Sequence, residues 1–115
     1  MTDLCAAADI PDGSGRTFVF GEGRNALGVI VLRAGDDVTA FVNLCPHFWI
    51  PLNVGERPAT FRNHVLCANH YAAFRFRDGY CVEGPCEGSS LDPVPLAVRD
   101  GRVAVDLANL APRAR

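Results

Sequence analysis

Residues 45–70 read CPHFWIPLNVGERPATFRNHVLCANH, a stretch that opens with Cys45-Pro46-His47 and closes with Cys67-Ala68-Asn69-His70. A Cys-x-His pair and a Cys-x-x-His pair are thus separated by nineteen residues. Thiolate and imidazole groups are ligands that zinc and iron centres use in proteins. Two such pairs, each at the edge of an apolar segment, predict a metal site that two loops build together.

Each pair supplies one thiolate and one imidazole, and this mixture bears on the kind of metal site. Structural zinc sites with two cysteines and two histidines usually group like residues with like. A two-iron centre in which two histidines replace two cysteines on one iron fits the mixed pairs better. The neutral imidazoles remove negative charge, so the reduction potential rises relative to an all-cysteine cluster. We therefore predict one [2Fe–2S] cluster, with a zinc-stabilised interaction module as an alternative.

The remaining cysteine and histidine residues are weaker candidates for chemistry. His64 lies three residues before Cys67, but on a strand it is expected to face solvent or pack against its neighbours. A Cys–His nucleophilic dyad would need an orienting group and a substrate pocket, and the sequence identifies neither. Cys5, Cys81 and Cys86 are expected to be small reduced side chains, with a Cys81–Cys86 disulfide as the alternative.

Outside the ligand pairs, short apolar segments alternate with Gly, Pro, Asp and Asn, which is typical of an all-β domain. Segments 27–32 and 38–42 flank Ala34-Gly35-Asp36-Asp37 and predict a hairpin. Asp78-Gly79 and Asp100-Gly101 are strong hairpin signals and predict two more.

Both ligand pairs are expected at strand ends. The apolar segment Phe61–Leu66 predicts a strand before the second pair, and Phe74 and Phe76 alternate with arginines on the strand after it. A rigid sheet can bring two such loops together. Residues 48–60 form a long irregular stretch, and a loop of that length in a compact domain is usually functional.

The length and composition bound the function further. A chain of 115 residues, of which 49% are hydrophobic and 21% charged, fits one globular domain over residues 1–115. The net charge is −2 and the eleven basic residues, all arginine, are scattered, so no basic stripe indicates nucleic-acid binding. No window approaches the roughly 18 apolar residues of a membrane helix, and residues 1–9 lack the basic flank of a signal peptide. We expect a cytoplasmic protein without a membrane partner.

These motifs together resemble the Rieske iron–sulfur proteins, specifically the small ferredoxin type. The resemblance covers roughly Leu4 to Asp106 and includes segments 8–13, 84–86 and 91–96 beside the two ligand pairs. It implies an antiparallel β-sandwich or barrel with a small cluster-binding subdomain. The cluster-binding loops would lie at about 45–50, 67–74 and 84–86.

The resemblance also implies a role for each ligand. Cys45 and Cys67 would hold the inner iron, while His47 and His70 would hold the outer, solvent-facing iron. The loop at Gly84-Pro85 would cover the cluster from a third side.

The residues that flank the ligands differ from those of the high-potential, quinol-oxidising members. Those members have an extra cysteine in each box, where this chain has Ile50 and Asn69, so the bridge between the loops cannot form. They also have Ser and Tyr donors to sulfur, where this chain has Ala72 and Phe74. Hydrogen bonds to sulfur stabilise the more negative reduced cluster, so their absence lowers the potential. The expected potential is near the bottom of the Rieske range, at roughly −150 mV.

The implied function is that of a one-electron carrier and not of an enzyme. The chain would be the ferredoxin component that passes electrons from a flavin-dependent reductase to a terminal, ring-hydroxylating oxygenase. A Rieske small subunit of another redox complex, similar to nitrite reductase, is the alternative. We expect a monomer that docks transiently near His47, His70 and Trp49, although Phe48 and Trp49 could equally cap the core.

Overall fold

The computed structural model describes residues 1–115 except 24–25, 46–50, 53–56, 68–71, 85–86 and 108–115. In the described part, antiparallel strands and one short 3₁₀ helix make up the regular structure, so the all-β expectation is confirmed. No helix in this part is long and apolar enough to span a bilayer. The elements are β1 (Thr2–Ala6), η1 (Ala7–Asp9), β2 (Ser14–Phe20), β3 (Leu27–Ala34), β4 (Asp37–Val42), β5 (Ala59–Phe61), β6 (His64–Leu66), β7 (Ala73–Arg75), β8 (Cys81–Glu83), β9 (Leu96–Arg99) and β10 (Arg102–Val105).

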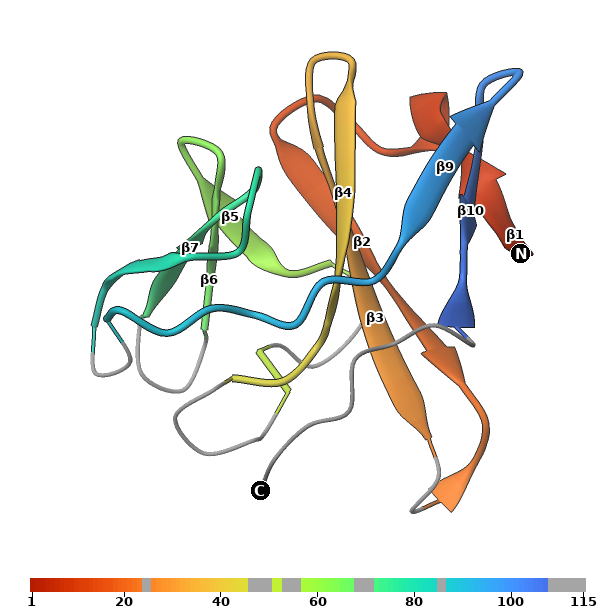
Figure 1. The fold of residues 1–115 in the computed structure, drawn as a ribbon. Helices are drawn as coiled ribbons and strands as arrows, with labels where there is room; N and C mark the ends of the chain where they lie inside the picture. Colours follow the sequence, from red (N-terminus) through yellow and green to blue (C-terminus); the bar gives the residue numbers. More distant parts are fainter. Residues whose placement is uncertain (24–25, 46–50, 53–56, 68–71, 85–86, 108–115) are drawn as a thin grey trace.

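The strands form three sheets, and the sheet β2-β3-β4 lies between the other two (Figure 1). Its central strand β3 has the fully buried run Val29 to Leu32. Successive side chains of a strand point to opposite faces of the sheet. Val29 and Val31 accordingly pack in one hydrophobic core, and Ile30 and Leu32 pack in another. The middle sheet therefore separates two cores and contributes side chains to both.

The sheet β1-β10-β9 covers the first of these cores. The predicted turn at Asp100-Gly101 joins β9 to β10, with both residues at positive φ (52° and 75°). Strand β1 pairs with β10, and Arg102 forms an ion pair with Asp3 at 2.6 Å. Burial raises the pKa of the Cys5 thiol on β1 above its ordinary value.

The sheet β5-β6-β7-β8 covers the second core and holds the segments around the predicted ligands. The sequence predicted one strand over Phe61–Leu66, and this prediction is wrong. The segment contains the end of β5, a two-residue turn at Arg62 and Asn63, and β6. Both turn residues have positive φ (50° and 60°), and sequence reasoning missed the turn because neither is glycine. The chain reverses there, so that β6 runs toward the second ligand pair.

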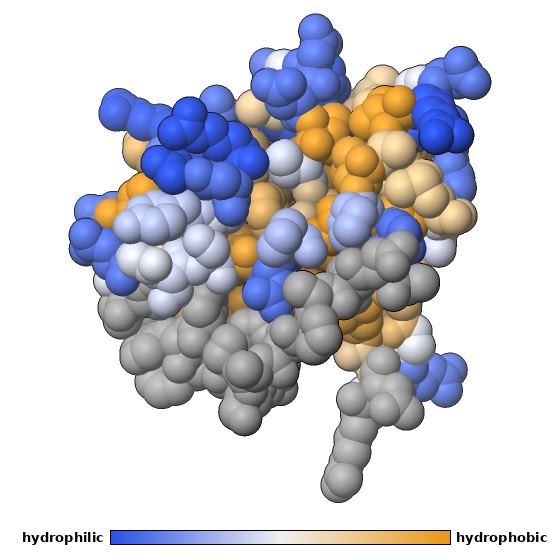
Figure 2. Space-filling model, in the orientation of Figure 1, coloured by the Kyte–Doolittle hydropathy of each residue, from blue (hydrophilic) through white to orange (hydrophobic). Residues whose placement is uncertain are grey.

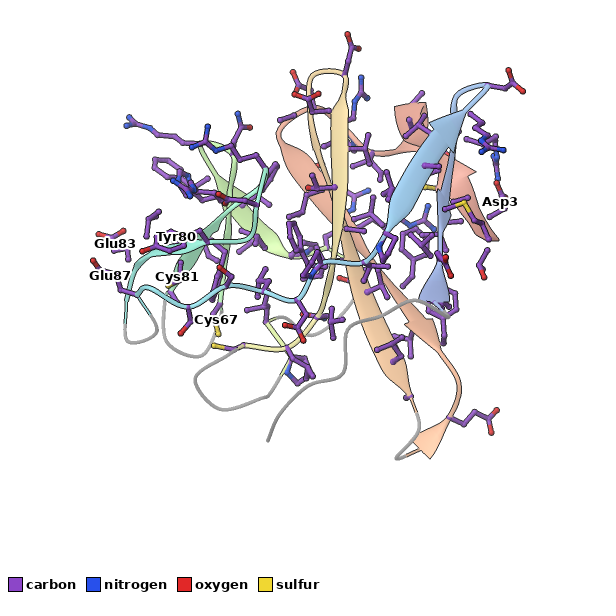
Figure 3. All side chains as sticks on the ribbon, in the orientation of Figure 1. Asp3, Cys67, Tyr80, Cys81, Glu83 and Glu87 are labelled. Carbon is purple, nitrogen blue, oxygen red and sulfur yellow. The ribbon has the colours of Figure 1, made fainter. Side chains whose placement is uncertain are left out.

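The surface reflects this division into sheets. Figure 2 shows hydrophilic residues along the upper rim of the molecule, with hydrophobic residues exposed between them. Glu83 and Glu87 lie on the same side of the molecule as Cys67, and Asp3 lies on the far side (Figure 3). Asp3 on β1 and Cys67 thus lie on different sides of the fold.

Candidate metal centre

The first ligand segment comes shortly after β4, a strand of the middle sheet. Strand β4 ends at Val42, whose N–H donates to the Asp92 carbonyl at 2.8 Å, and Cys45 comes three residues later. The Cys45 side chain is fully buried. His47, together with Phe48 and Trp49, lies outside the described residues.

A buried polar residue closes the first ligand segment on itself. The Leu52 N–H donates to the Asn43 side-chain Oδ1 at 2.9 Å, across the loop that contains Cys45. Asn43 is 5% exposed and Leu52 is fully buried. Sequence reasoning missed this residue. The signal that could have found it is an amide side chain inside the otherwise apolar run from β4 to Cys45.

The second ligand segment begins where β6 ends. Val65 and Cys67 are fully buried, whereas Leu66 between them is partly exposed, as expected for alternating strand positions. The Cys67 N–H donates to the Ala72 carbonyl at 2.8 Å and closes the loop that carries His70. His70 itself lies outside the described residues. The expected loop 67–74 is shorter in the structure, since β7 begins at Ala73.

The third predicted segment packs against the second. Gly84 has φ +103°, and a Cβ at this position would lie 2.7 Å from the Ala72 Cα. The glycine therefore allows the backbone after β8 to approach the second ligand loop closely. The Cys81 thiol beside it donates to the Glu83 carbonyl at 3.2 Å. Pro85 and Cys86 lie outside the described residues, as does any Cys81–Cys86 bond.

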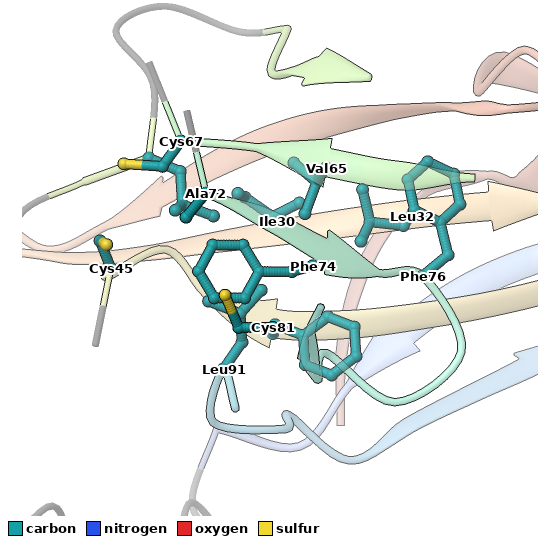
Figure 4. Packing of buried hydrophobic residues seen from close by; sticks show 12 residues of the cluster. Ile30, Leu32, Cys45, Val65, Cys67, Ala72, Phe74, Phe76, Cys81 and Leu91 are labelled. Atoms are coloured by element: carbon teal, nitrogen blue, oxygen red, sulfur yellow. The ribbon is translucent and has the colours of Figure 1, made fainter. Parts of the chain in front are cut away.

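The two cysteine ligands predicted from the sequence come together in the structure. Cys45 and Cys67 belong to one buried core, and Figure 4 shows their sulfurs at the same end of it. Thiols buried at one end of an apolar core, on two different loops, fit the inner half of a metal cluster. Among the described residues no group of three or more His, Cys, Asp or Glu side chains gathers to hold a metal.

His64 stands apart from this end of the core. It lies three positions before Cys67 on β6, so its side chain points to the opposite face of the sheet. Its Nδ1 lies 2.8 Å from the Arg62 carbonyl in the hairpin turn. His64 therefore contacts a neighbouring residue of the turn, as expected for its position on a strand.

Two described residues in the core of Cys67 have side chains without a hydroxyl group. Ala72 and Phe74 are both fully buried in the same core as Cys67. Strand alternation directs the Phe74 ring inward, where it lies between Ala72 and Leu91 in Figure 4. Neither side chain can donate a hydrogen bond to sulfur.

The comparisons with known proteins agree with this arrangement. The model of the Rieske [2Fe-2S] domain family matches residues 1–104. A comparison with curated protein sequences finds no match.

Solved structures with the same fold include whole ferredoxins. The chain is 26% identical, at a TM-score of 0.72, to a chain in the complex of reduced oxygenase and oxidized ferredoxin of carbazole 1,9a-dioxygenase, with 90% of this chain and 89% of that one covered. It is 23% identical, at a TM-score of 0.66, to the ferredoxin of carbazole 1,9a-dioxygenase from Nocardioides aromaticivorans IC177, with 98% and 100% covered. It also matches the terminal oxygenase from the same organism at 23% identity and a TM-score of 0.74, with 98% of this chain but 31% of the oxygenase chain covered.

The family model matches residues 1–104, which is most of the chain, and the domain of this family binds one [2Fe–2S] cluster. The ferredoxin from Nocardioides aromaticivorans IC177 is covered over its whole length. The chain belongs to the Rieske [2Fe-2S] domain family.

Proposed function

We propose that Cys45, His47, Cys67 and His70 hold the [2Fe–2S] cluster. Two thiolates on one iron and two imidazoles on the other make up the ligand set of Rieske centres. The burial of both cysteines at one end of a core supports the thiolate half of this assignment. The order and spacing of the two pairs in the sequence support the imidazole half.

The bound cluster would supply reversible one-electron chemistry. The described residues shape the surroundings of the cluster. The core around Phe74 and Leu91 excludes water from the cysteine side, and the backbone hydrogen bond from Cys67 to Ala72 fixes one thiol relative to its loop. A dry, fixed environment of this kind reduces the reorganisation that accompanies a change of charge. The histidine side would be the exit for the electron.

As to biological role, the chain passes single electrons from a flavin-dependent reductase to a terminal, ring-hydroxylating oxygenase and catalyses no reaction of its own. One observation carries this proposal: the chain and a ferredoxin of carbazole 1,9a-dioxygenase cover each other almost completely. We place it in the cytoplasm as a monomer, with docking near His47, His70 and Trp49.

The ligand assignment is tested by electron paramagnetic resonance of anaerobically purified, dithionite-reduced protein, with iron and sulfide counts. Cys45→Ser and Cys67→Ser should lose the Rieske spectrum. Cys81→Ser is the matched control, because Cys81 is a fully buried cysteine of the same core that is not a proposed ligand. An all-cysteine spectrum, or zinc in place of iron, would contradict the assignment.

The carrier role is tested by rapid mixing. The reduced protein should be reoxidised by a terminal oxygenase of the ring-hydroxylating class, and the oxidised protein should be reduced by a flavin reductase with NADH. Electron transfer should saturate only weakly, since carrier encounters bury small interfaces of below about 1,200 Å². A chain that copurifies with a large partner in fixed stoichiometry would contradict a mobile carrier.

A further inference from the structure

The Asn43 side chain is a buried polar group next to the first ligand loop. Asn43 is 5% exposed, and among the described residues it is the one buried polar or charged residue. A buried amide is retained at a net cost unless its hydrogen bonds are made. The hydrogen bonds of Asn43 therefore indicate which parts of the fold it joins.

Both the backbone and the side chain of Asn43 are tied to other parts of the fold. The Asn43 N–H donates to the Gly28 carbonyl on β3 at 2.9 Å. The side-chain Oδ1 accepts the Leu52 N–H at 2.9 Å. The first bond fixes Asn43 to the middle sheet, and the second fixes the far end of the loop to Asn43.

Gly28 provides the space in which this amide lies. A Cβ at Gly28 would lie 3.3 Å from the Asn43 Cβ, which is tighter than an ordinary contact, and 3.8 Å from the Asn43 Nδ2. A side chain on β3 at this point would press on Asn43. The Asn43 side chain and the bare backbone at Gly28 thus form one unit, which we call the Asn43 clamp.

The clamp acts on the geometry of the metal ligands. Cys45 lies two residues after Asn43, and both Cys45 and Leu52 are fully buried in the same core. Cys45 thus lies in the chain between two residues that a buried hydrogen bond joins. A displacement of Asn43 or Leu52 would act on the position of Cys45.

We infer that Asn43 is a positioning residue for the cluster: by accepting the Leu52 N–H, it sets how Cys45 is presented to the iron. The inference rests on the proposed ligand role of Cys45. The ligand variants test that role separately, because they abolish the cluster, whereas variants of the clamp should still assemble it with altered properties.

The decisive variant is Asn43→Leu, which keeps the branched shape and removes the acceptor. It leaves the Leu52 N–H buried without its partner, a change that corresponds to roughly a five- to hundredfold effect on an equilibrium. We expect the variant to release iron to a chelator faster by a factor in that range, with shifted g values in the reduced spectrum. Asn43→Asp keeps an oxygen acceptor and should lie closer to the wild type in both measurements.

Val103→Ala is the control for general destabilisation, because Val103 is fully buried in the other core. It should lower the unfolding temperature. At a temperature where all the proteins are folded, it should leave the g values and the iron-release rate unchanged. The inference is overturned if Asn43→Leu has the same iron-release rate and the same spectrum as Val103→Ala.

If Asn43→Leu does not fold, Gly28→Ala tests the same clamp from the β3 side. It should change spectrum and release in the same direction, and an unchanged spectrum there would equally overturn the inference.

Discussion

Ala72 and Phe74 determine the polarity next to the cysteine ligands. Both are fully buried in the core of Cys67, and neither side chain has a polar group that could donate a hydrogen bond to a sulfur. A reduced cluster carries more negative charge than an oxidised one and gains more from such donors. The absence of hydroxyl groups at these two positions is the physical reason why we expect a low reduction potential.

Adding a hydroxyl at either position should therefore raise the potential. We expect Ala72→Ser and Phe74→Tyr each to raise it by roughly 20–65 mV, the one-electron equivalent of a net hydrogen bond of about 0.5–1.5 kcal/mol. Protein-film voltammetry measures the shift. Ala73→Ser is the control, because Ala73 is the next residue of β7 and faces the other side of the sheet. An equal shift in Ala73→Ser would show that the effect is not local to the sulfurs.

Gly84 determines how closely the third loop approaches the second. A Cβ there would lie 2.7 Å from the Ala72 Cα and 3.2 Å from its N, and backbone atoms cannot move aside as a flexible side chain can. We expect Gly84→Ala to destabilise the protein by about 1–3 kcal/mol or more and to accelerate cluster loss. Urea unfolding and iron release to a chelator measure the two effects.

Gly88→Ala separates conformational strain from the clash. Gly88 also has positive φ (+91°), but no atom of the described residues lies within 4 Å of its added Cβ. It should show the smaller loss that the backbone conformation alone causes, with cluster retention unchanged. Equal behaviour of the two variants would contradict a role of the Gly84–Ala72 contact.

At the scale of the element, the hairpin of β7 and β8 is held by side chains at its turn. The Arg75 guanidinium donates to both carboxylate oxygens of Asp78, at 2.5 and 3.0 Å, and the Tyr80 N–H donates to Oδ1 at 3.0 Å. The same guanidinium lies over the Tyr80 ring, 4.9 Å from its centroid. The bond from Arg75, followed by that from the Tyr80 N–H, lowers the pKa of the Asp78 carboxyl below its usual value.

This lowered pKa makes the stability of the hairpin depend on pH. Because the folded pKa lies below the ordinary value of 3.8, the stabilisation is complete above 3.8 and is lost as the pH falls through the folded pKa. We expect Asp78→Asn to lower the free energy of unfolding near neutral pH by roughly 0.3–1 kcal/mol, a small figure because solvent screens this exposed pair. The difference from the wild type should shrink below pH 3.8 in urea titrations followed by circular dichroism. A difference that is constant across this range would exclude the ionised carboxylate as its cause.

At the scale of the whole molecule, the middle sheet separates two cores with different tasks. One core contains Cys45 and Cys67, and the other is covered by β1, β10 and β9. Ile30 on β3 belongs to the core that contains Cys45 and Cys67, and Ile10 belongs to the other core; both are fully buried. The same substitution can therefore be made once in each core.

We expect Ile30→Ala and Ile10→Ala each to lower the free energy of unfolding by roughly 2–5 kcal/mol, since each leaves a cavity. Only Ile30→Ala should also accelerate the loss of the cluster under conditions where the protein stays folded, because its cavity adjoins the cysteine side. Thermal unfolding and iron release distinguish the two effects. Equal release rates would mean that the cores are mechanically coupled through β3.

Docking of the whole molecule on its partners can be tested with a pair of aromatic residues. If Trp49 is part of the docking surface, Trp49→Ala should slow second-order electron transfer to the oxygenase by about five- to tenfold, the effect of losing an interface anchor. The reduction potential should stay unchanged. Phe61→Ala is the control: Phe61 is 61% exposed and lies at the turn end of the ligand-bearing sheet, away from Cys67. Equal slowing in the control would place the docking surface elsewhere.

The sequence by itself determined the features that depend on local chemistry. The turn at Asp100-Gly101 and the apolar runs of β3 and β4 were predicted, because positive φ and a period of two are properties of neighbouring residues. The hairpin at Asp78-Gly79 was also predicted, but its connection is longer than a two-residue turn, because β7 ends at Arg75 and β8 begins at Cys81. The turn at Arg62 and Asn63 escaped prediction, because that pair carries no glycine to mark it.

Only the tertiary structure decided which distant segments meet. It paired β1 with β10 across nearly the whole chain, divided β3 between two cores, and brought Cys45 and Cys67 to the same end of one of them. It also placed Asn43 against Leu52 and Gly84 against Ala72. Such contacts depend on shape and hydrogen-bond complementarity between segments far apart in sequence. No local pattern encodes them, so the ligands could be named from the sequence, but the residues that hold their loops could not.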